Sequence, residues 1–152
     1  MKLIRLCKEE EVKSILERKD FDGVGKKYQN NEKLNNFNYD PNEKYLHFFR
    51  DISGILYLDS TKGNYICTYL VPDELLEGKN GYGKYLDYVN FKQLQLVPEF
   101  AIESKFLSFD NLEKVEKIVK DIDYHDLFFN PYFKGLTETI YDAEDERDLG
   151  EN

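Results

Sequence analysis

Three polar residues interrupt apolar, strand-like stretches of the chain, and each has a side chain that could take part in chemistry. Glu99 lies within the apolar residues 97–102, Arg5 within residues 3–7 and His47 within residues 45–49. An ionised group that is buried without a partner is costly. Two interpretations of Glu99 remain open: it faces solvent or an arginine, or it lines a cleft and is kept there for chemistry.

The common catalytic and metal-binding motifs are missing from the sequence. It has no GxxxxGK[ST] or GxGxxG phosphate loop, no GxSxG elbow and no HExxH pair. Two histidines, His47 and His125, are too few for a multi-histidine metal centre. His125 and Asp126 are adjacent, but such a pair is more typical of a surface turn. The sequence therefore predicts no metal site.

The two cysteines, Cys7 and Cys67, each lie in an apolar, strand-like run and have no CxxC spacing. This pattern predicts buried, reduced thiols. A disulfide between them would need adjacent strands and an oxidising compartment, and nothing in the sequence indicates such a compartment.

Aromatic residues are unusually frequent: the chain has 12 Tyr and 11 Phe but no Trp. Most of these rings must belong to the core or its rim, because each buries a large apolar area. Some could form a cleft in which a planar ligand stacks. The candidates for such a cleft are Tyr45, Phe48, Phe49, Tyr82, Tyr85 and Tyr88.

Length and composition predict one globular domain. A chain of 152 residues with 41% hydrophobic and 34% charged residues is long enough for a single core, and no apolar run is long enough to cross a bilayer. The first apolar stretch is short and is followed at once by Lys8 and three glutamates, which does not fit a signal peptide. We therefore expect a cytoplasmic protein.

The negative charge is concentrated at the C-terminus. Residues 142–152 hold six acids and one arginine, which contribute −5 to the net charge of −9. The chain lacks a basic stripe, so non-specific nucleic-acid binding is disfavoured. We predict a single α+β domain over residues 1–136 and an acidic tail over residues 137–152, disordered or helical. The tail either frays in solvent or contacts a basic protein partner.

Hydrophobic periodicity outlines the elements of the N-terminal half. Strands are predicted at residues 3–7, 44–50 and 65–71, and an amphipathic helix at residues 8–19. Residues 20–42 are rich in turn formers and predict a long surface loop. Residues 52–58 fit a strand or a short helix.

The C-terminal half is predicted in the same way. Residues 73–77 fit a single helical turn, residues 78–83 a turn, and residues 84–92 and 94–102 strands. A capping-box pattern at Asp110 predicts a helix that runs to about residue 122. The aromatic residues 124–133 are expected to pack back on the sheet. There is no internal repeat and no linker that would divide the chain.

Three strand-borne polar residues, one early, one in an aromatic strand and a late glutamate, resemble the three-part pattern of ADP-ribosyltransferase-like folds. Residues 65–85, with Leu-Val-Pro-Asp-Glu-Leu-Leu and Gly-Tyr-Gly-Lys-Tyr, and the Pro-Glu-Phe-Ala-Ile at residues 98–102 also resemble small bacterial proteins of this type. The resemblance covers most of residues 2–122.

The resemblance implies a split antiparallel or mixed β-sheet with two or three flanking helices and a cleft that holds NAD. Glu99 matches the catalytic glutamate, which binds the nicotinamide ribose and stabilises positive charge as the glycosidic bond breaks. Arg5 would anchor ribose or phosphate through its planar fork. The aromatic residues implied in nicotinamide binding are Tyr45, His47, Phe48, Phe49 and Tyr85.

The resemblance also implies an activity. The expected protein is an NAD-dependent ADP-ribosyltransferase or NAD glycohydrolase that acts on an unknown acceptor macromolecule. The chain departs from the family pattern at two points: Val97 stands where many members have Gln or Glu, and the aromatic strand lacks a Ser-Thr-Ser run. Members without the upstream Gln or Glu often modify targets other than arginine, and some lose activity, so the sequence does not identify the acceptor. The alternatives are a non-catalytic acidic binding protein of the immunity type, and a small-ligand binder that uses the aromatic cleft alone.

Overall fold

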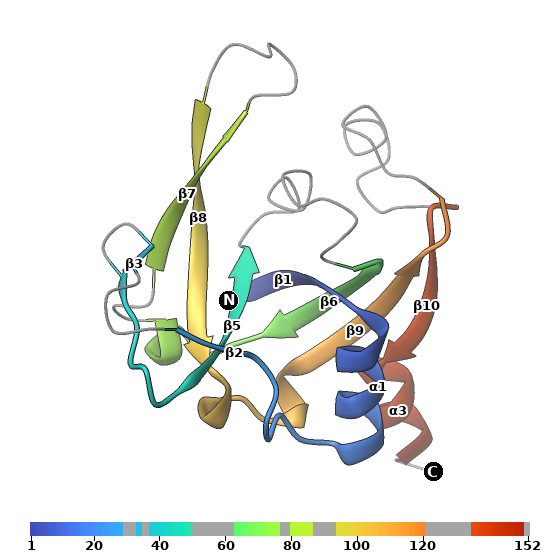
Figure 1. Cartoon of the computed structure of the whole chain (residues 1–152). Coiled ribbons are helices and arrows are strands. Elements are labelled where there is room, and N and C mark those ends of the chain that lie inside the picture. The colour runs from blue at the N-terminus through green and yellow to red at the C-terminus, as the bar shows by residue number, and fades with distance from the viewer. Residues whose placement is uncertain are drawn as a thin grey trace.

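An antiparallel β-sheet with a few helices organises the chain (Figure 1). The structure is a computed structural model that describes residues 1–28, 33–34, 37–49, 63–76, 80–86, 94–120 and 135–150. The strands of the sheet run in the order β10-β9-β6-β1-β5-β8-β7, and β2 pairs with β5. Every described pairing is antiparallel. The predicted α+β class is confirmed at this level.

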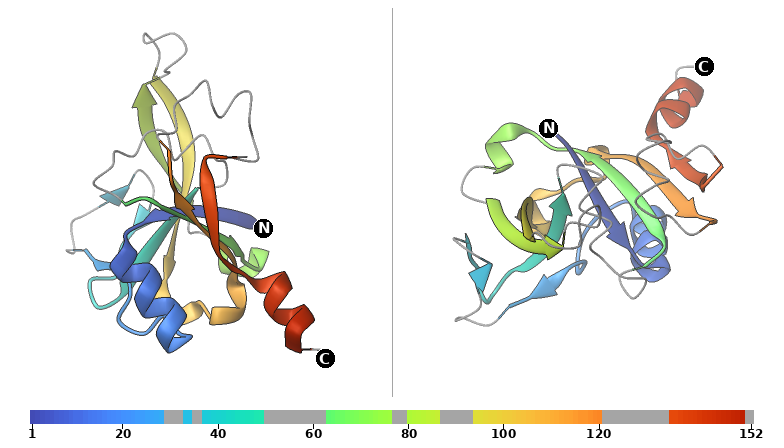
Figure 2. Two further views of the ribbon diagram at one scale, coloured as in Figure 1. Left: turned by 90° about the vertical axis from the view of Figure 1, so that its right-hand side faces the viewer. Right: turned by 90° about the horizontal axis from the view of Figure 1, so that it is seen from above.

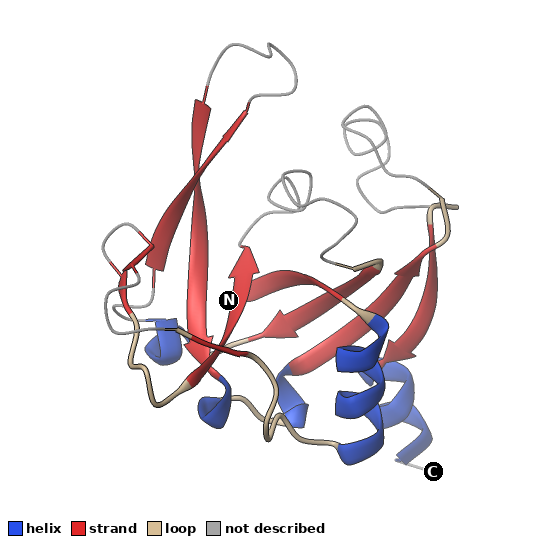
Figure 3. Cartoon of the chain, in the orientation of Figure 1, coloured by secondary structure: helices blue, strands red, loops and turns tan. Residues whose placement is uncertain are grey.

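The strands of the main sheet are β1 (Lys2–Cys7), β2 (Lys26–Lys27), β5 (Lys44–Phe49), β6 (Tyr65–Leu70), β7 (Asn80–Leu86), β8 (Leu94–Glu103), β9 (Leu112–Ile118) and β10 (Thr137–Asp142). A separate two-stranded pair consists of β3 (Lys33–Leu34) and β4 (Phe37–Asn38), so the predicted loop at residues 20–42 contains short strands. The described helices are α1 (Glu9–Arg18) and α3 (Ala143–Gly150), with 3-10 turns η3 (Asp73–Leu76), η4 (Ser104–Phe106) and η5 (Phe109–Asn111). The helices gather toward one end of the sheet, whereas the β7–β8 hairpin extends toward the other (Figure 3).

The sheet consists of two groups of strands that meet at β1 and β5. β1 is in register with β6 over six residue pairs, and β5 with β8 over five. Among the described residues, Ile4 and Phe49 are the pair in register between β1 and β5. Figure 2 shows the hairpin β7–β8 standing away from β9 and β10. Arg5 adds a side-chain contact between the two groups, because its Nη1 donates to the His47 carbonyl oxygen.

Helix α1 covers one face of the sheet. Strand alternation brings Leu3, Arg5 and Cys7 to this face. Val12 and Ile15 of α1 pack against it within the main core. The helix has glutamates in its first turn, where they complement the helix dipole, and it ends at Lys19, whose φ of 60° is left-handed. The core of this face is the cluster Leu3, Cys7, Val12, Ile15, Phe21, Leu46, Phe48, Cys67, Tyr69, Phe100, Ile102, Leu112 and Val115, with further buried neighbours.

The predicted helix at residues 110–122 is wrong, because Leu112–Ile118 form strand β9. The apolar residues of this segment are spaced three or four positions apart, as in an amphipathic helix. The segment is nevertheless a strand, because β9 pairs with β6 on one side and with β10 on the other. Its lysines meet acids across the sheet: Lys117 opposes Glu138, and Lys114 opposes Asp142. Such opposite-charge pairs stabilise a strand that isolated propensity would not favour. The capping box lies at Ser108 and Asn111 and begins only the 3-10 turn η5.

Two further element boundaries in the structure differ from those predicted from the sequence. Residues 80–83, expected to turn, already belong to β7, which pairs with β8 from Asn80 onward. Residues 137–142 of the predicted tail form β10 at the edge of the sheet, and α3 follows directly. The Asp142 carboxylate accepts a hydrogen bond from the Glu144 amide at 3.0 Å, which begins that helix. Residues 52–58, 87–93 and 124–133 lie outside the described residues. Within the described part of the chain, no helix is both long and apolar enough to span a membrane.

Candidate functional site

Arg5 is held by a bidentate ion pair with Glu11. Its Nε lies 2.8 Å from Glu11 Oε2 and its Nη2 lies 2.6 Å from Oε1, while Nη1 donates to the His47 carbonyl oxygen at 3.1 Å. The two side chains are only 18% and 15% exposed. Burial by itself would lower the pKa of Arg5, but the hydrogen bonds and charge of Glu11 raise it above its ordinary value. The fork that was expected to bind phosphate therefore joins α1, β1 and β5.

His47 lies on the opposite face of the sheet, in a cluster of tyrosines. Its Nε2 is 2.6 Å from the Tyr28 hydroxyl, and the two rings meet edge to face at 5.5 Å. Tyr28 stacks on Tyr39 with 4.0 Å between ring centroids, and Tyr39 meets Tyr45 edge to face at 5.0 Å. We call Tyr28, Tyr39, Tyr45 and His47 the tyrosine–histidine cluster. Tyr39 and Tyr45 are buried, whereas Tyr28 and His47 are half-buried, so the latter two are the rings of the cluster that a ligand can reach.

Tyr45 anchors this cluster to the sheet. Its hydroxyl accepts a hydrogen bond from the Asp40 amide at 2.9 Å and donates to Glu103 Oε1 at 3.3 Å. The residue is 2% exposed. Burial, together with the Glu103 carboxylate, raises the pKa of Tyr45, so the phenol stays neutral at physiological pH. The base of the cluster is thus fixed by polar contacts.

The backbone of Glu99 lies on β8, next to the part of β5 that carries His47. Glu99 pairs with Phe49 on β5 and with Gly81 on β7, and Ala101 pairs with His47. Glu99 and His47 are therefore diagonal positions on one face, which lie about 7–8 Å apart in an antiparallel pair. The side chains of Glu99 and Tyr85 lie outside the described part of the structure.

The sequence-predicted residues thus divide between the two faces. Tyr45, His47, Phe49 and the backbone position of Glu99 share one face. Arg5 belongs to the α1 face, as does Phe48, which is 0% exposed and packs edge to face on Tyr69 at 5.0 Å. Glu11, Tyr28 and Tyr39 were not among the sequence-predicted site residues. The signal for Glu11 was available: Arg5 is a single charge in an apolar strand, and the helix that follows begins with three glutamates, one of which could pair with it.

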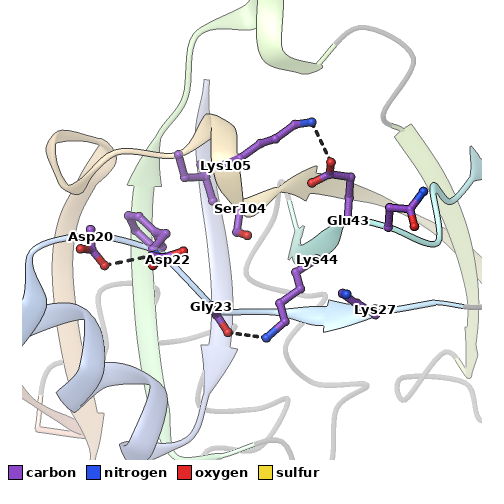
Figure 4. A pocket seen from close by; sticks show the side chains of 11 residues that line it. Asp20, Asp22, Gly23, Lys27, Glu43, Lys44, Ser104 and Lys105 are labelled. Atoms are coloured by element: carbon purple, nitrogen blue, oxygen red, sulfur yellow. Dashed lines mark hydrogen bonds and ion pairs between the residues drawn. The ribbon is translucent and has the colours of Figure 1, made fainter.

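A polar concavity of about 440 Å³ lies beside β2 and η4, apart from these residues (Figure 4). Several of its charged side chains contact each other or the backbone. Lys105 Nζ lies 2.9 Å from Glu43 Oε1, and Lys44 Nζ donates to the Gly23 carbonyl oxygen at 2.8 Å. None of the sequence-predicted site residues is among its described lining residues. We assign no chemistry to it.

The two cysteines are free and buried, as predicted. They lie on the paired strands β1 and β6, and their sulfur atoms are 3.1 Å apart. The hydrogen bond with Cys67, burial and neighbouring negative charge hold the pKa of Cys7 well above its usual range. Within the described residues, no group of three or more His, Cys, Asp or Glu side chains is arranged to hold a metal ion.

Stability is expected to fall at alkaline pH. Burial raises the pKa of Tyr69 well above its usual range, and Cys7 and Tyr45 shift in the same direction. An unfolded chain loses these protons near the ordinary pKa values of 9.0 for cysteine and 10.0 for tyrosine, whereas the folded chain keeps them. The stabilisation is complete below those values and is lost as the pH rises through them.

The measurement is the melting temperature between about pH 8 and about pH 11, with a thiol reductant present. Tyr69→Phe removes one of the three groups and should make the decline shallower. A melting temperature that stays constant or rises over this range would contradict the assignment.

The tyrosine–histidine cluster, the adjoining position of Glu99 and the Arg5–Glu11 pair are thus the main polar features of the described sheet. Comparison of the chain with protein-family models, with curated proteins and with solved structures finds no match.

Proposed function

We propose that the protein binds NAD on the sheet face that carries the tyrosine–histidine cluster, and that it acts as an NAD glycohydrolase or ADP-ribosyltransferase. One observation carries this proposal: His47 and Glu99 occupy diagonal positions of β5 and β8 on one face, beside stacked tyrosines. A glutamate position on a sheet face that also carries aromatic rings suits a ligand with a planar leaving group on a sugar.

The chemistry assigns a separate role to each group. The N-glycosidic bond breaks, nicotinamide leaves with the bonding electrons, and water or an acceptor nucleophile adds to the ribose carbon. Glu99 stabilises the positive charge that develops on the ribose, an interaction stronger in the transition state than in the ground state. Tyr28 and His47, the half-buried rings of the cluster, contact the nicotinamide ring, and their mutual hydrogen bond fixes the orientation of His47.

This proposal differs from the family pattern in its phosphate anchor. Arg5 is excluded from that role because Glu11 and the His47 carbonyl oxygen occupy its fork on the α1 face. Lys26 is a better choice. It is exposed, opposes Tyr45 in register on β2, and its Nζ lies 4.9 Å from the centre of the Tyr28 ring. Its ammonium is thus next to the cluster and open to solvent.

Glu99→Gln is expected to lower the rate of nicotinamide release from NAD by roughly 100- to 1,000-fold, because loss of one electrostatic stabiliser typically costs that much. NAD should still raise the melting temperature of this variant, because Tyr28 and His47, which contact the nicotinamide ring, are unchanged. The measurements are nicotinamide release by chromatography and thermal unfolding with and without NAD.

Glu138→Gln is the matched control. Glu138 is an exposed strand glutamate on β10, at the far edge of the sheet. Its replacement should change neither the rate of nicotinamide release nor the rise in melting temperature that NAD produces. The proposal fails if the wild type neither releases nicotinamide nor melts at a higher temperature with NAD in excess.

A further inference from the structure

The contact between Cys7 and Cys67 is set by the backbone of two adjacent strands. Cys7 opposes Tyr65, and Cys67 opposes Arg5, so the two cysteines are diagonal neighbours on the α1 face. Their sulfur atoms lie 3.1 Å apart. A disulfide has a sulfur–sulfur distance of about 2.0 Å, so the sulfur atoms must approach by about 1 Å. The two strands must also adjust, because diagonal positions lie about 7–8 Å apart and bridged Cα atoms lie within about 7 Å.

The thiols of Cys7 and Cys67 are buried, but local opening of the fold can bring them into contact with solvent. Cys7 is 2% and Cys67 1% exposed, and both belong to the buried cluster that includes Val12 and Ile15 of α1. Cys7 ends β1 directly before α1 begins at Glu9. A helix of 10 residues is marginal without its packing. Local opening of its first turn would expose both sulfurs without global unfolding.

We propose that Cys7 and Cys67 are an oxidative modification site, at which a peroxide converts the two thiols into an intramolecular disulfide that joins β1 to β6. One sulfur attacks an oxygen of hydrogen peroxide, the O–O bond breaks, and a sulfenic acid and one water result. The second sulfur attacks the sulfenic sulfur, the S–O bond breaks, and hydroxide leaves with the second thiol proton as water. The thiols lose two electrons, and the peroxide is reduced to two waters.

The disulfide has a structural consequence that does not depend on the proposed NAD chemistry. It closes a long loop between the first and fourth strands of the main sheet in chain order. Cross-links of this kind stabilise mainly by restricting the unfolded chain. Oxidation would therefore stabilise the β1–β6 pair and the base on which α1 packs.

The test is peptide mapping of the full chain after treatment with hydrogen peroxide, followed by alkylation under denaturing conditions. We expect one peptide pair that joins Cys7 to Cys67, separated by reduction, and loss of both alkylatable thiols. Mapping is needed because Met1, which is 40% exposed, also takes up oxygen and changes the intact mass. The melting temperature should rise by roughly 5–15 °C.

Cys67→Ala is the control and should give neither the cross-link nor the rise in melting temperature. A second treatment in mild denaturant separates slow access from an unsuitable geometry, because it opens α1 more often. Sulfinic acid on either cysteine instead of the cross-link would overturn the proposal. Two thiols that remain alkylatable after both treatments would overturn it as well.

Discussion

Arg5→Ala is expected to lower the free energy of unfolding by about 3–5 kcal/mol, the usual cost of removing one partner from a buried ion pair. The Glu11 carboxylate would lose both hydrogen bonds from the guanidinium while only 15% exposed. The His47 carbonyl oxygen would lose its donor at the junction of β1 and β5.

The measurement is urea unfolding followed by circular dichroism. Arg18→Ala is the matched control, because Arg18 pairs with Asp20 and Asp22 but is 48% exposed. Exposed pairs contribute about 0–1 kcal/mol, so this control should change stability little. Arg5→Lys keeps the charge but not the planar fork, and should lie between the two. Equal effects of Arg5→Ala and Arg18→Ala would contradict a structural role for Arg5.

The double variant Arg5→Met, Glu11→Leu tests the origin of the cost. If the loss in Arg5→Ala comes from an uncompensated carboxylate, replacing both partners with apolar residues should recover most of the stability. A double variant as unstable as Arg5→Ala would mean instead that the hydrogen bond to His47 carries the effect. Either result separates the ion pair from any role of Arg5 in ligand binding.

Gly63→Ala is expected to destabilise the fold by roughly 3–5 kcal/mol, through backbone strain and steric overlap together. Gly63 has a φ of +119°, which L side chains rarely adopt. A Cβ at this position would overlap the Cys7 carbonyl group and lie 2.6 Å from the Lys8 amide nitrogen. These are backbone atoms at the end of β1, so no side chain can move to relieve the clash.

Gly135→Ala is its control, because Gly135 also has a positive φ of +77° but nothing lies within 4 Å of an added Cβ. It should cost only the conformational strain, about 1–2 kcal/mol. Thermal and urea unfolding of both variants measure the difference. Similar losses in the two variants would show that the approach of Gly63 to Cys7 contributes nothing.

The elements whose signals are local could be predicted from the amino-acid sequence. Strands at residues 3–7, 44–50 and 65–71 and the helix at residues 8–19 correspond to β1, β5, β6 and α1. Their apolar periodicity and turn residues lie within each segment. The sequence also identified Arg5 as a charge that needed a partner, and the two cysteines as buried free thiols, because burial of such groups follows from their immediate neighbours.

Which distant segments lie next to each other could not be predicted from the sequence and is seen in the folded chain. Residues 112–118 have a helical spacing, yet pairing with β6 and β10 makes them a strand. Arg5 and His47 both interrupt apolar strands, but alternation places them on opposite faces, and the partner of Arg5 is Glu11. Cys7 and Cys67 are 60 residues apart and touch because β1 and β6 are neighbours. Strand order, register and facing are properties of contacts between distant segments, and a local pattern does not record them.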